Sequence, residues 1–209
     1  MRRHSSFALR RALSSTISGV SLLSGATGSQ IVEFAIALPL LMVLVVGIFD
    51  FGAAFNVKQK VVNAAREGAR VASNQATNDL WPPGVTGSCT APTSVCAIRD
   101  AVDNALVTSS VKDCGLASAN GASAGNLAWT FSPGGCVGTM TLTIERGFTY
   151  TATLPNPPFQ QAYTIEATRI TLNYPYRWTF NRVVQLLVSG ANYPATSQLK
   201  SVAVMQNLN

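Results

Sequence analysis

The sequence predicts an α+β protein in which a long N-terminal helix crosses a membrane and continues outside it, followed by a small domain of helix and antiparallel sheet. Three observations predict this fold. Residues 34–55 are a run of 22 residues in which Asp50 is the only charge. Residues 56–75 keep small or apolar side chains at helical spacing. Beyond them, short segments rich in threonine, aromatic and β-branched residues are typical of strands. We therefore divide the chain into a leader (1–28), a transmembrane helix (29–55), its extramembrane extension (56–75) and a domain (76–209).

The apolar run is long enough to cross a bilayer, because a hydrocarbon core of ~30 Å needs roughly 20 helical residues. A single segment satisfies its backbone in lipid only as a helix. Pro39 lies inside the run and removes one N–H donor, so we expect a local bend there. The helical spacing continues beyond the run, which predicts one helix from Ile31 to Ser73.

The basic residues are unevenly distributed. The formal charge is +6, but four arginines (Arg2, Arg3, Arg10 and Arg11) lie in the first 28 residues, which contain no acid. The remaining 11 basic and 9 acidic residues give a net charge of +2. No basic patch with interleaved aromatic residues remains in the domain, so nucleic acid is not an expected partner. The basic leader places the N-terminus in the cytoplasm, although Lys58 and Lys60 on the other flank weaken that bias.

The domain is predicted to contain one amphipathic helix near its start, Val95–Val107, and a closing helix, Phe180–Val188. The spans Lys112–Gly125 and Pro155–Pro158 are predicted to be loop or turn. The strand-like segments are Leu127–Phe131, Met140–Ile144, Phe148–Thr153 and Ile165–Tyr174, with Ser201–Met205 as an edge strand.

Four cysteines, Cys89, Cys96, Cys114 and Cys136, lie within 48 residues of each other. An even number of cysteines in a loop-rich exported region favours disulfides, and four thiols allow three pairings. Zinc and free buried thiols are the alternatives, but no Cys-x-x-Cys pair is present for zinc. We expect disulfides, with no metal and no cofactor.

A glycine, Gly28, precedes an apolar run that begins with an acid, Glu33. Cleavage after Gly28 would make Ser29 the new N-terminus and Glu33 its fifth residue. This spacing resembles the processing site of type IV pilin-like precursors, which a prepilin peptidase cuts. An acid inside the membrane costs ~2.5–3.5 kcal/mol and needs a partner, which the freed amine of a neighbouring helix could supply. The alternative is an interfacial acid that is favoured near a helix N-terminus.

The wider sequence pattern favours the pilin-like processing site. The segments EFAIALPLL, GIFDFG and VVNAAREGARVAS closely resemble the N-terminal region of TadE-like proteins of the tight-adherence pilus system. The matching positions are Glu33, Pro39 and 65–70; Phe34 takes the place where many pilin-like sites carry tyrosine. The resemblance covers about 45 residues from Gly28 and leaves the cysteine region without an assigned role.

The resemblance implies a minor pseudopilin or pilus assembly protein. It implies a single span in the bacterial inner membrane, a periplasmic domain, and a place in the biogenesis of a thin adhesive fimbria, into which the helix packs or which it primes. The implied partners are a prepilin peptidase, other pilins or pseudopilins through the N-terminal helix, the inner-membrane assembly machinery and the lipid bilayer. An uncleaved, membrane-tethered binding module is the alternative function.

Small residues on the extension, Ala65, Gly68 and Ala69, let backbones approach closely and favour a helix–helix contact. The alternative is a solvated face on which Glu67 pairs with Arg70. For Asp50 we expect an interfacial acid that reaches water, in preference to one that binds a partner.

Catalysis is not expected. The only histidine is His4, in the leader, so a mature chain lacks the base of a Ser-His-Asp or Cys-His site. Asp100 and Asp103 lie three residues apart on a predicted helix, where a solvated face is the simpler interpretation. A secreted enzyme with a signal anchor is therefore disfavoured.

Overall fold

The computed structural model describes residues 26–80, 89–156, 159–179, 185, 190 and 196–208. It divides into two compact units, residues 1–45 and residues 46–209. The first helix, α1 (Ala26–Asn74), contributes to both units. The predicted leader, apart from its last three residues, and the predicted helix Phe180–Val188, apart from Gln185, lie outside the described residues.

The prediction of one long N-terminal helix is confirmed. Helix α1 has 49 residues and includes Pro39 without interruption. An 18-residue window of this helix reaches a mean hydropathy of 2.7, and none of the window is buried. By length and composition α1 is therefore able to cross a membrane.

Helix α2 (Thr93–Thr108) forms where the amphipathic pattern predicted it. Its apolar residues Val95, Ile98, Val102 and Leu106 recur at three-to-four spacing, and all four are fully buried. A short 3-10 turn, η1 (Asn78–Leu80), follows α1, and another, η2 (Leu116–Ser118), follows α2.

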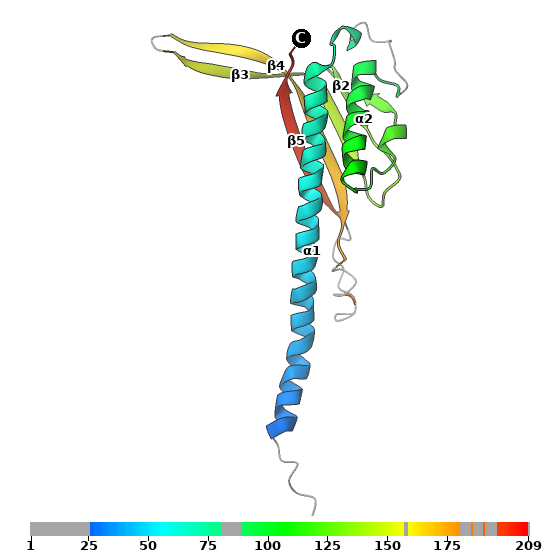
Figure 1. The fold of residues 1–209 in the computed structure, drawn as a ribbon, viewed down its shortest axis with the longest axis vertical. Helices are drawn as coiled ribbons and strands as arrows, with labels where there is room; N and C mark the ends of the chain where they lie inside the picture. Colours follow the sequence, from blue (N-terminus) through cyan, green and yellow to red (C-terminus); the bar gives the residue numbers. More distant parts are fainter. Residues whose placement is uncertain are drawn as a thin grey trace, which may run out of the picture. The chain divides into compact units, whose positions relative to one another are not determined.

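The sheet is an antiparallel meander of five strands in the order β1-β2-β3-β4-β5. The strands are β1 (Gly121–Ser123), β2 (Ala128–Phe131), β3 (Thr141–Asn156), β4 (Phe159–Arg177) and β5 (Thr196–Gln206). Figure 1 shows α1 and α2 beside one another on one face of this sheet. The alternation of buried Leu142, Ile144, Ile170 and Leu172 with threonines explains why this face is the one covered.

Three strand predictions are corrected. The loop predicted over Lys112–Gly125 contains η2 and β1. The prediction missed β1 because this strand consists of small residues that carry no strand pattern. The predicted strands Met140–Ile144 and Phe148–Thr153 are one strand, β3, with a bulge between Glu145 and Phe148. Pro155 and Asn156, predicted as part of a turn or loop, belong to β3, and the rest of that prediction lies outside the described residues.

Strands β3 and β4 continue beyond the rest of the sheet as a two-stranded ribbon. Their pairing extends from Phe148↔Ala167 to Asn156↔Phe159, whereas β2 pairs with β3 only as far as Glu145. Strand β5 likewise reaches β4 only from Ala167 onwards. Figure 1 shows this ribbon projecting from the domain.

The core lies between the helices and the covered face of the sheet. Helix α1 contributes a stripe of small residues, and α2 and the sheet contribute the large ones. The largest fully buried side chains include Phe131, Ile98, Leu106, Leu142 and Ile144. The fold therefore uses the outer part of α1 as one layer of the domain core.

Candidate functional site

The segment that carries the predicted processing site lies at the beginning of α1. Gly28 and Ser29 are in the first turn of the helix, which begins at Ala26. A Cβ placed on Gly28 would meet nothing within 4 Å, so the position is open. The bond between Gly28 and Ser29 is therefore on the exposed surface of α1, close to the first described residue.

Glu33 is exposed one turn beyond Ser29. The Ser29 hydroxyl lies 3.5 Å from a Glu33 carboxylate oxygen, the outer limit for a hydrogen bond. Large apolar side chains surround this acid on the helix surface: Phe34 is 61% exposed and Ile36 is 74% exposed. A carboxylate in such a setting is costly in lipid unless an opposite charge meets it.

Pro39 lies within the same apolar section of α1 and is partly buried. The residues after it, from Leu40 to Leu44, are exposed except for half-buried Val43. Within this unit, the described residues thus present apolar side chains around most of the helix circumference. That is the pattern of a helix whose solvent is lipid or other helices.

The small residues of the extension pack inside the domain. Ala65 and Ala69 are 0% and 1% exposed. A Cβ on Gly68 would lie 2.4 Å from a methyl group of Val102 on α2 and 3.0 Å from Ile170 Cδ1 on β4. The close helix approach that these residues allow is therefore made with α2 of the same chain. Glu67, on the other side of α1, accepts a 2.9 Å hydrogen bond from Arg70 Nε, and this bond lowers the pKa of the Glu67 carboxyl.

Asp50 is buried, and the expectation of an acid that reaches water is wrong. Its side chain accepts hydrogen bonds from Tyr176 Oη at 3.0 Å and from Thr179 Oγ1 at 3.2 Å. The residue is only 5% exposed. We call Asp50, Tyr176 and Thr179 the Asp50 cluster. Burial, together with this hydrogen bond and the charge of Asp50, raises the pKa of Tyr176 to about 12.

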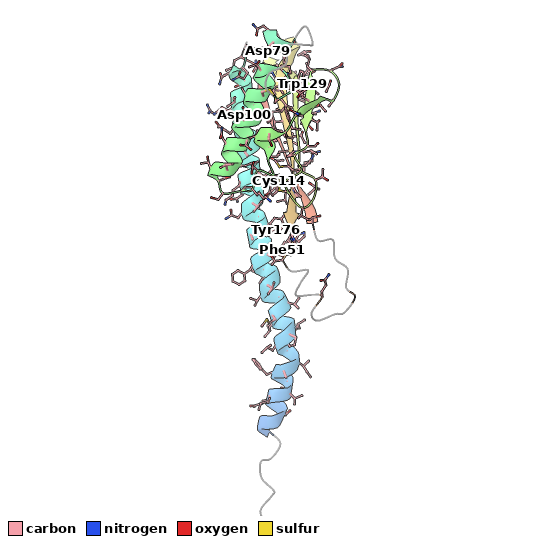
Figure 2. The ribbon with its side chains drawn as sticks, turned by 90° about the vertical axis from the view of Figure 1, so that its right-hand side faces the viewer. Phe51, Asp79, Asp100, Cys114, Trp129 and Tyr176 are labelled. Atoms are coloured by element: carbon pink, nitrogen blue, oxygen red, sulfur yellow. A yellow bond between two sulfur atoms is a disulfide. The ribbon has the colours of Figure 1, made fainter. Side chains whose placement is uncertain are left out.

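Aromatic rings surround the Asp50 cluster. Trp178 makes edge-on contacts with Phe51 and with Tyr176, at centroid distances of 5.2 and 5.0 Å. Its indole Nε1 donates to Ser197 Oγ at 2.7 Å, which ties β5 to the end of β4. Figure 2 shows Phe51 and Tyr176 at the same level of α1. This end of the domain is thus fastened to α1 by polar and aromatic contacts together.

At the other end of the contact between α1 and the sheet, the attachment is made by Arg146. This residue lies in the bulge of β3 and is 2% exposed. Its Nη2 donates to the carbonyl oxygens of Gln75 at 2.9 Å and Ala76 at 3.1 Å, and its Nη1 donates to that of Ala72. Ala72 lies in the last turn of α1, where intrahelical donors run out, and Gln75 and Ala76 follow directly after the helix. We call this set of contacts the Arg146 cap. Burial lowers the pKa of Arg146, an effect that the charge of Asp79 opposes.

The last described residues add to this attachment. Leu208 N donates to the Ser73 carbonyl at 3.1 Å, and Asn207 N donates to the Glu166 carbonyl at 3.1 Å. Thr168 Oγ1 lies between them: it accepts from Arg146 Nη1 at 3.3 Å and donates to Asn207 Oδ1 at 2.8 Å. The end of α1 is therefore held by β3, β4 and the segment after β5.

The prediction of disulfides is confirmed, with the pairing Cys89–Cys96 and Cys114–Cys136. The first joins the segment before α2 to its first turn, and the second joins the loop after α2 to the loop before β3. All four cysteines are consumed, so no thiolate remains for the zinc alternative.

In the part of the chain that the structure describes, Asp100 is half-buried and binds Arg99, while Asp103 accepts from Ala117 N at 3.2 Å. Burial and neighbouring acids raise the pKa of Asp103.

Comparison with known families agrees with the placement of these features. Residues 28–70 match the family model of the TadE-like proteins. The N-terminal helix is TadE-like. The match includes Gly28, Glu33, Pro39 and the small-residue stripe, and it ends before the domain elements begin. It associates the chain with tight-adherence pili. No curated protein and no solved structure matches the chain.

The TadE-like match therefore covers 43 of 209 residues, and the domain has to be understood from its own contacts. Sequence reasoning identified Gly28, Ser29, Glu33, Phe34 and Pro39 on the exposed section of α1. It missed Arg146, whose flanking Glu145 and Gly147 look like a break between strands. It also missed the partners of Asp50, which lie 126 and 129 residues away along the chain.

Proposed function

We propose that this chain is a minor pseudopilin of a tight-adherence pilus system. A prepilin peptidase cuts it after Gly28, and its N-terminal helix then packs with the helices of other pilins or pseudopilins. Before assembly the chain is held by α1 in the bacterial inner membrane, with the domain on the periplasmic side, where it meets the assembly machinery. The observation that carries this proposal is the TadE-like match on a helix whose apolar surface is exposed and holds a single early acid, Glu33.

The physical argument concerns this acid. Glu33 lies among exposed apolar side chains, and no positively charged residue lies between Gly28 and Phe55. Cleavage after Gly28 creates an α-amino group at Ser29, which is mostly protonated near neutral pH. When helices pack, the amine of one chain can meet Glu33 of its neighbour. Such a pair would fix the axial register between the helices, a role that buried polar pairs perform in other helical assemblies.

A minor role fits the size of the domain. Residues 76–209 carry α2, a five-stranded sheet and two disulfides. A filament built mainly of bare helices has little room for such a domain in every subunit. We propose a priming, tip or assembly role without a catalytic step, since the single histidine, His4, precedes the cleavage point.

N-terminal mass spectrometry of the protein from piliated cells tests the processing step. We expect the mature chain to begin at Ser29. Gly28→Val should block cleavage, because a branched side chain next to the cut bond hinders the approach of the peptidase, while α1 itself has room for the side chain. A chain that keeps Met1 and Gly28 would contradict the proposal and favour an uncleaved, membrane-tethered binding module.

The register argument is tested by Glu33→Gln, with Glu67→Gln as the matched control on the same helix. We expect the Glu33 variant to be cut normally but to co-purify poorly with fimbriae. The control removes an exposed acid that already has Arg70 as its partner, so it should assemble normally. Normal piliation in the Glu33 variant would remove the ion-pair argument while leaving the processing proposal intact.

A further inference from the structure

We propose that the end of the domain around the Asp50 cluster rests on the membrane surface and binds the headgroups of anionic phospholipids. The surface, which we call the collar, consists of three aromatic and three basic residues: Phe51, Phe55, Trp178, Lys58, Arg177 and Lys200. This inference rests on insertion of α1 into a bilayer and is independent of cleavage and of the pilus role.

The aromatic part of the collar lies where the exposed apolar surface of α1 ends. Phe51 and Phe55 are 69% and 65% exposed, although they belong to the half of α1 that is part of the domain unit. Trp178 stacks edge-on against Phe51 and is itself only half-buried. Tryptophan is enriched at the boundary between lipid and water because its ring is apolar and its N–H is polar. Here the N–H is satisfied by Ser197, which leaves the ring to face the lipid.

The basic part begins at the same end of the domain and continues along β5. Arg177 follows Tyr176 on β4 and is exposed, and the exposed Lys200 on β5 pairs with Asn173, four residues before Arg177 on β4. Lys58 on α1 donates to the backbone carbonyl of Lys200, which brings the two lysines together. Asp50 is buried and bound by Tyr176 and Thr179, while Asp113, near Tyr174, is partly exposed. The three basic residues outnumber this acid on the described surface, which therefore complements negatively charged lipid phosphates.

The basic residues of the collar lie at two levels along α1. Lys58 is eight residues beyond Asp50, which is ~12 Å along the helix. The headgroup layer adds roughly 5–8 Å on each side of the hydrocarbon core. With Asp50 and Phe51 at the edge of the hydrocarbon, Arg177 is at the level of the headgroups. Lys58 and its neighbour Lys200 lie just beyond that layer, within the ~10 Å over which their charges act on the phosphates.

Quenching of tryptophan fluorescence by brominated lipid tests the position of Trp178. The full chain is reconstituted in phosphatidylglycerol vesicles whose acyl chains carry bromine close to the headgroup. We expect a quenched component that disappears in Trp178→Phe. Figure 2 shows Trp129 at the other end of the domain from Phe51 and Tyr176, so Trp129→Phe should leave the quenched intensity unchanged. Equal quenching with and without Trp178 would overturn the proposal.

A tryptophan in the apolar section of α1 separates failure of the collar from failure of insertion. In a Leu44→Trp variant that also carries Trp178→Phe, we expect quenching by bromine placed deep in the chains. If this tryptophan is quenched and Trp178 is not, the collar is wrong, and its surface is then available to a protein partner. If neither is quenched, α1 does not insert, and the proposed membrane placement fails together with the collar.

The preference for anionic lipid is tested in mixed vesicles. At equal mole fraction, brominated phosphatidylglycerol should quench Trp178 more than brominated phosphatidylcholine does, because the basic residues enrich it locally. We expect this excess to be lost at high salt and in the double variant Arg177→Gln, Lys200→Gln. The control double variant Arg66→Gln, Lys112→Gln removes the same charge from exposed positions outside the collar and should keep the excess. Loss in both variants, or in neither, would overturn the assignment of headgroup binding to the collar.

Discussion

The domain is fastened to α1 at two places that use opposite chemistry. At the Asp50 cluster, the helix supplies the charged group, and the domain supplies the hydroxyls of Tyr176 and Thr179. At the Arg146 cap, the domain supplies the charged group, and the helix supplies its backbone carbonyls. Both charged side chains are nearly inaccessible, at 5% and 2% exposure. The two places are 22 residues apart along the helix, from Asp50 to Ala72, which is ~33 Å.

The difference follows from where each contact meets the helix. In the middle of a helix every backbone carbonyl already accepts an intrahelical bond, so a side chain is the better acceptor for a donor from the domain. The Tyr176 hydroxyl accordingly lies 3.0 Å from the Asp50 carboxylate and 3.3 Å from the Asp50 backbone carbonyl. At the C-terminal end the last carbonyls lack the donor of a following turn and carry the negative end of the helix dipole, so a guanidinium can bond to them directly. An arginine is therefore suited to the end of α1, and an acid to its middle.

The largest effect is expected from removing the Arg146 cap. Arg146→Met should lower the free energy of unfolding by about 3 kcal/mol, because several carbonyls at the end of α1 lose their donor in a buried place. Urea unfolding of the full chain in mild detergent, followed by circular dichroism, measures the change. Arg66→Met, an exposed arginine on the same helix, is the control and should be near neutral. Equal effects of the two changes would mean that the cap does not hold the domain.

A smaller effect is expected in the apolar seam between the two attachments. Gly68→Ala should destabilise by about 2 kcal/mol, because the new Cβ would meet the Val102 methyl at 2.4 Å and force the two helices apart. Gly52→Ala places the same group in open space on the same helix and should be neutral or slightly stabilising. Thermal unfolding compares the two variants. A neutral Gly68→Ala would mean that the Val102 side chain moves aside without separating α1 from α2.

The two attachments also show what the sequence allows one to predict. The helices and the sheet could be predicted, since a 3.6-residue or two-residue period of apolar residues is a local property. The exposed part of the site could be predicted too, because Gly28, Glu33 and Pro39 lie close together in the chain. The attachments could not, because each joins residues 70 or more positions apart. A charged residue that will be buried by such a contact has the same local pattern as one that stays in water.

The Asp50 cluster separates the effect of charge from that of hydrogen bonding. Asp50→Ala should cost about 1.5 kcal/mol, since two hydroxyls lose an ionised acceptor in a buried place. Asp50→Asn keeps an acceptor oxygen at the same position and should cost less. Unfolding in detergent measures both variants. If Asp50→Asn is as costly as Asp50→Ala, the negative charge of Asp50 holds the cluster together. Each of the two attachments would then depend on one buried charge, negative at Asp50 and positive at Arg146.

The smallest effect, and the most specific, is expected from Tyr176→Phe. Near neutral pH the loss of the hydroxyl should cost about 1 kcal/mol, because its hydrogen bond to Asp50 disappears. The pKa of Tyr176 is about 12 in the fold and about 10 in its absence, so the folded state keeps the proton longer than the unfolded state. The stability that the hydroxyl contributes is therefore complete below pH 10 and is lost as the pH rises towards 12.

The difference in unfolding free energy between the wild-type chain and Tyr176→Phe should accordingly narrow across that window, while the other tyrosines titrate alike in both chains. An unchanged difference would mean that Asp50 does not face the hydroxyl. In an Asp50→Asn background the pKa of Tyr176 should rise less, because the negative charge that disfavours the tyrosinate is gone. The difference in unfolding free energy should then finish narrowing at a lower pH. The backbone carbonyls at the Arg146 cap carry no titratable charge, so they cannot produce such a dependence.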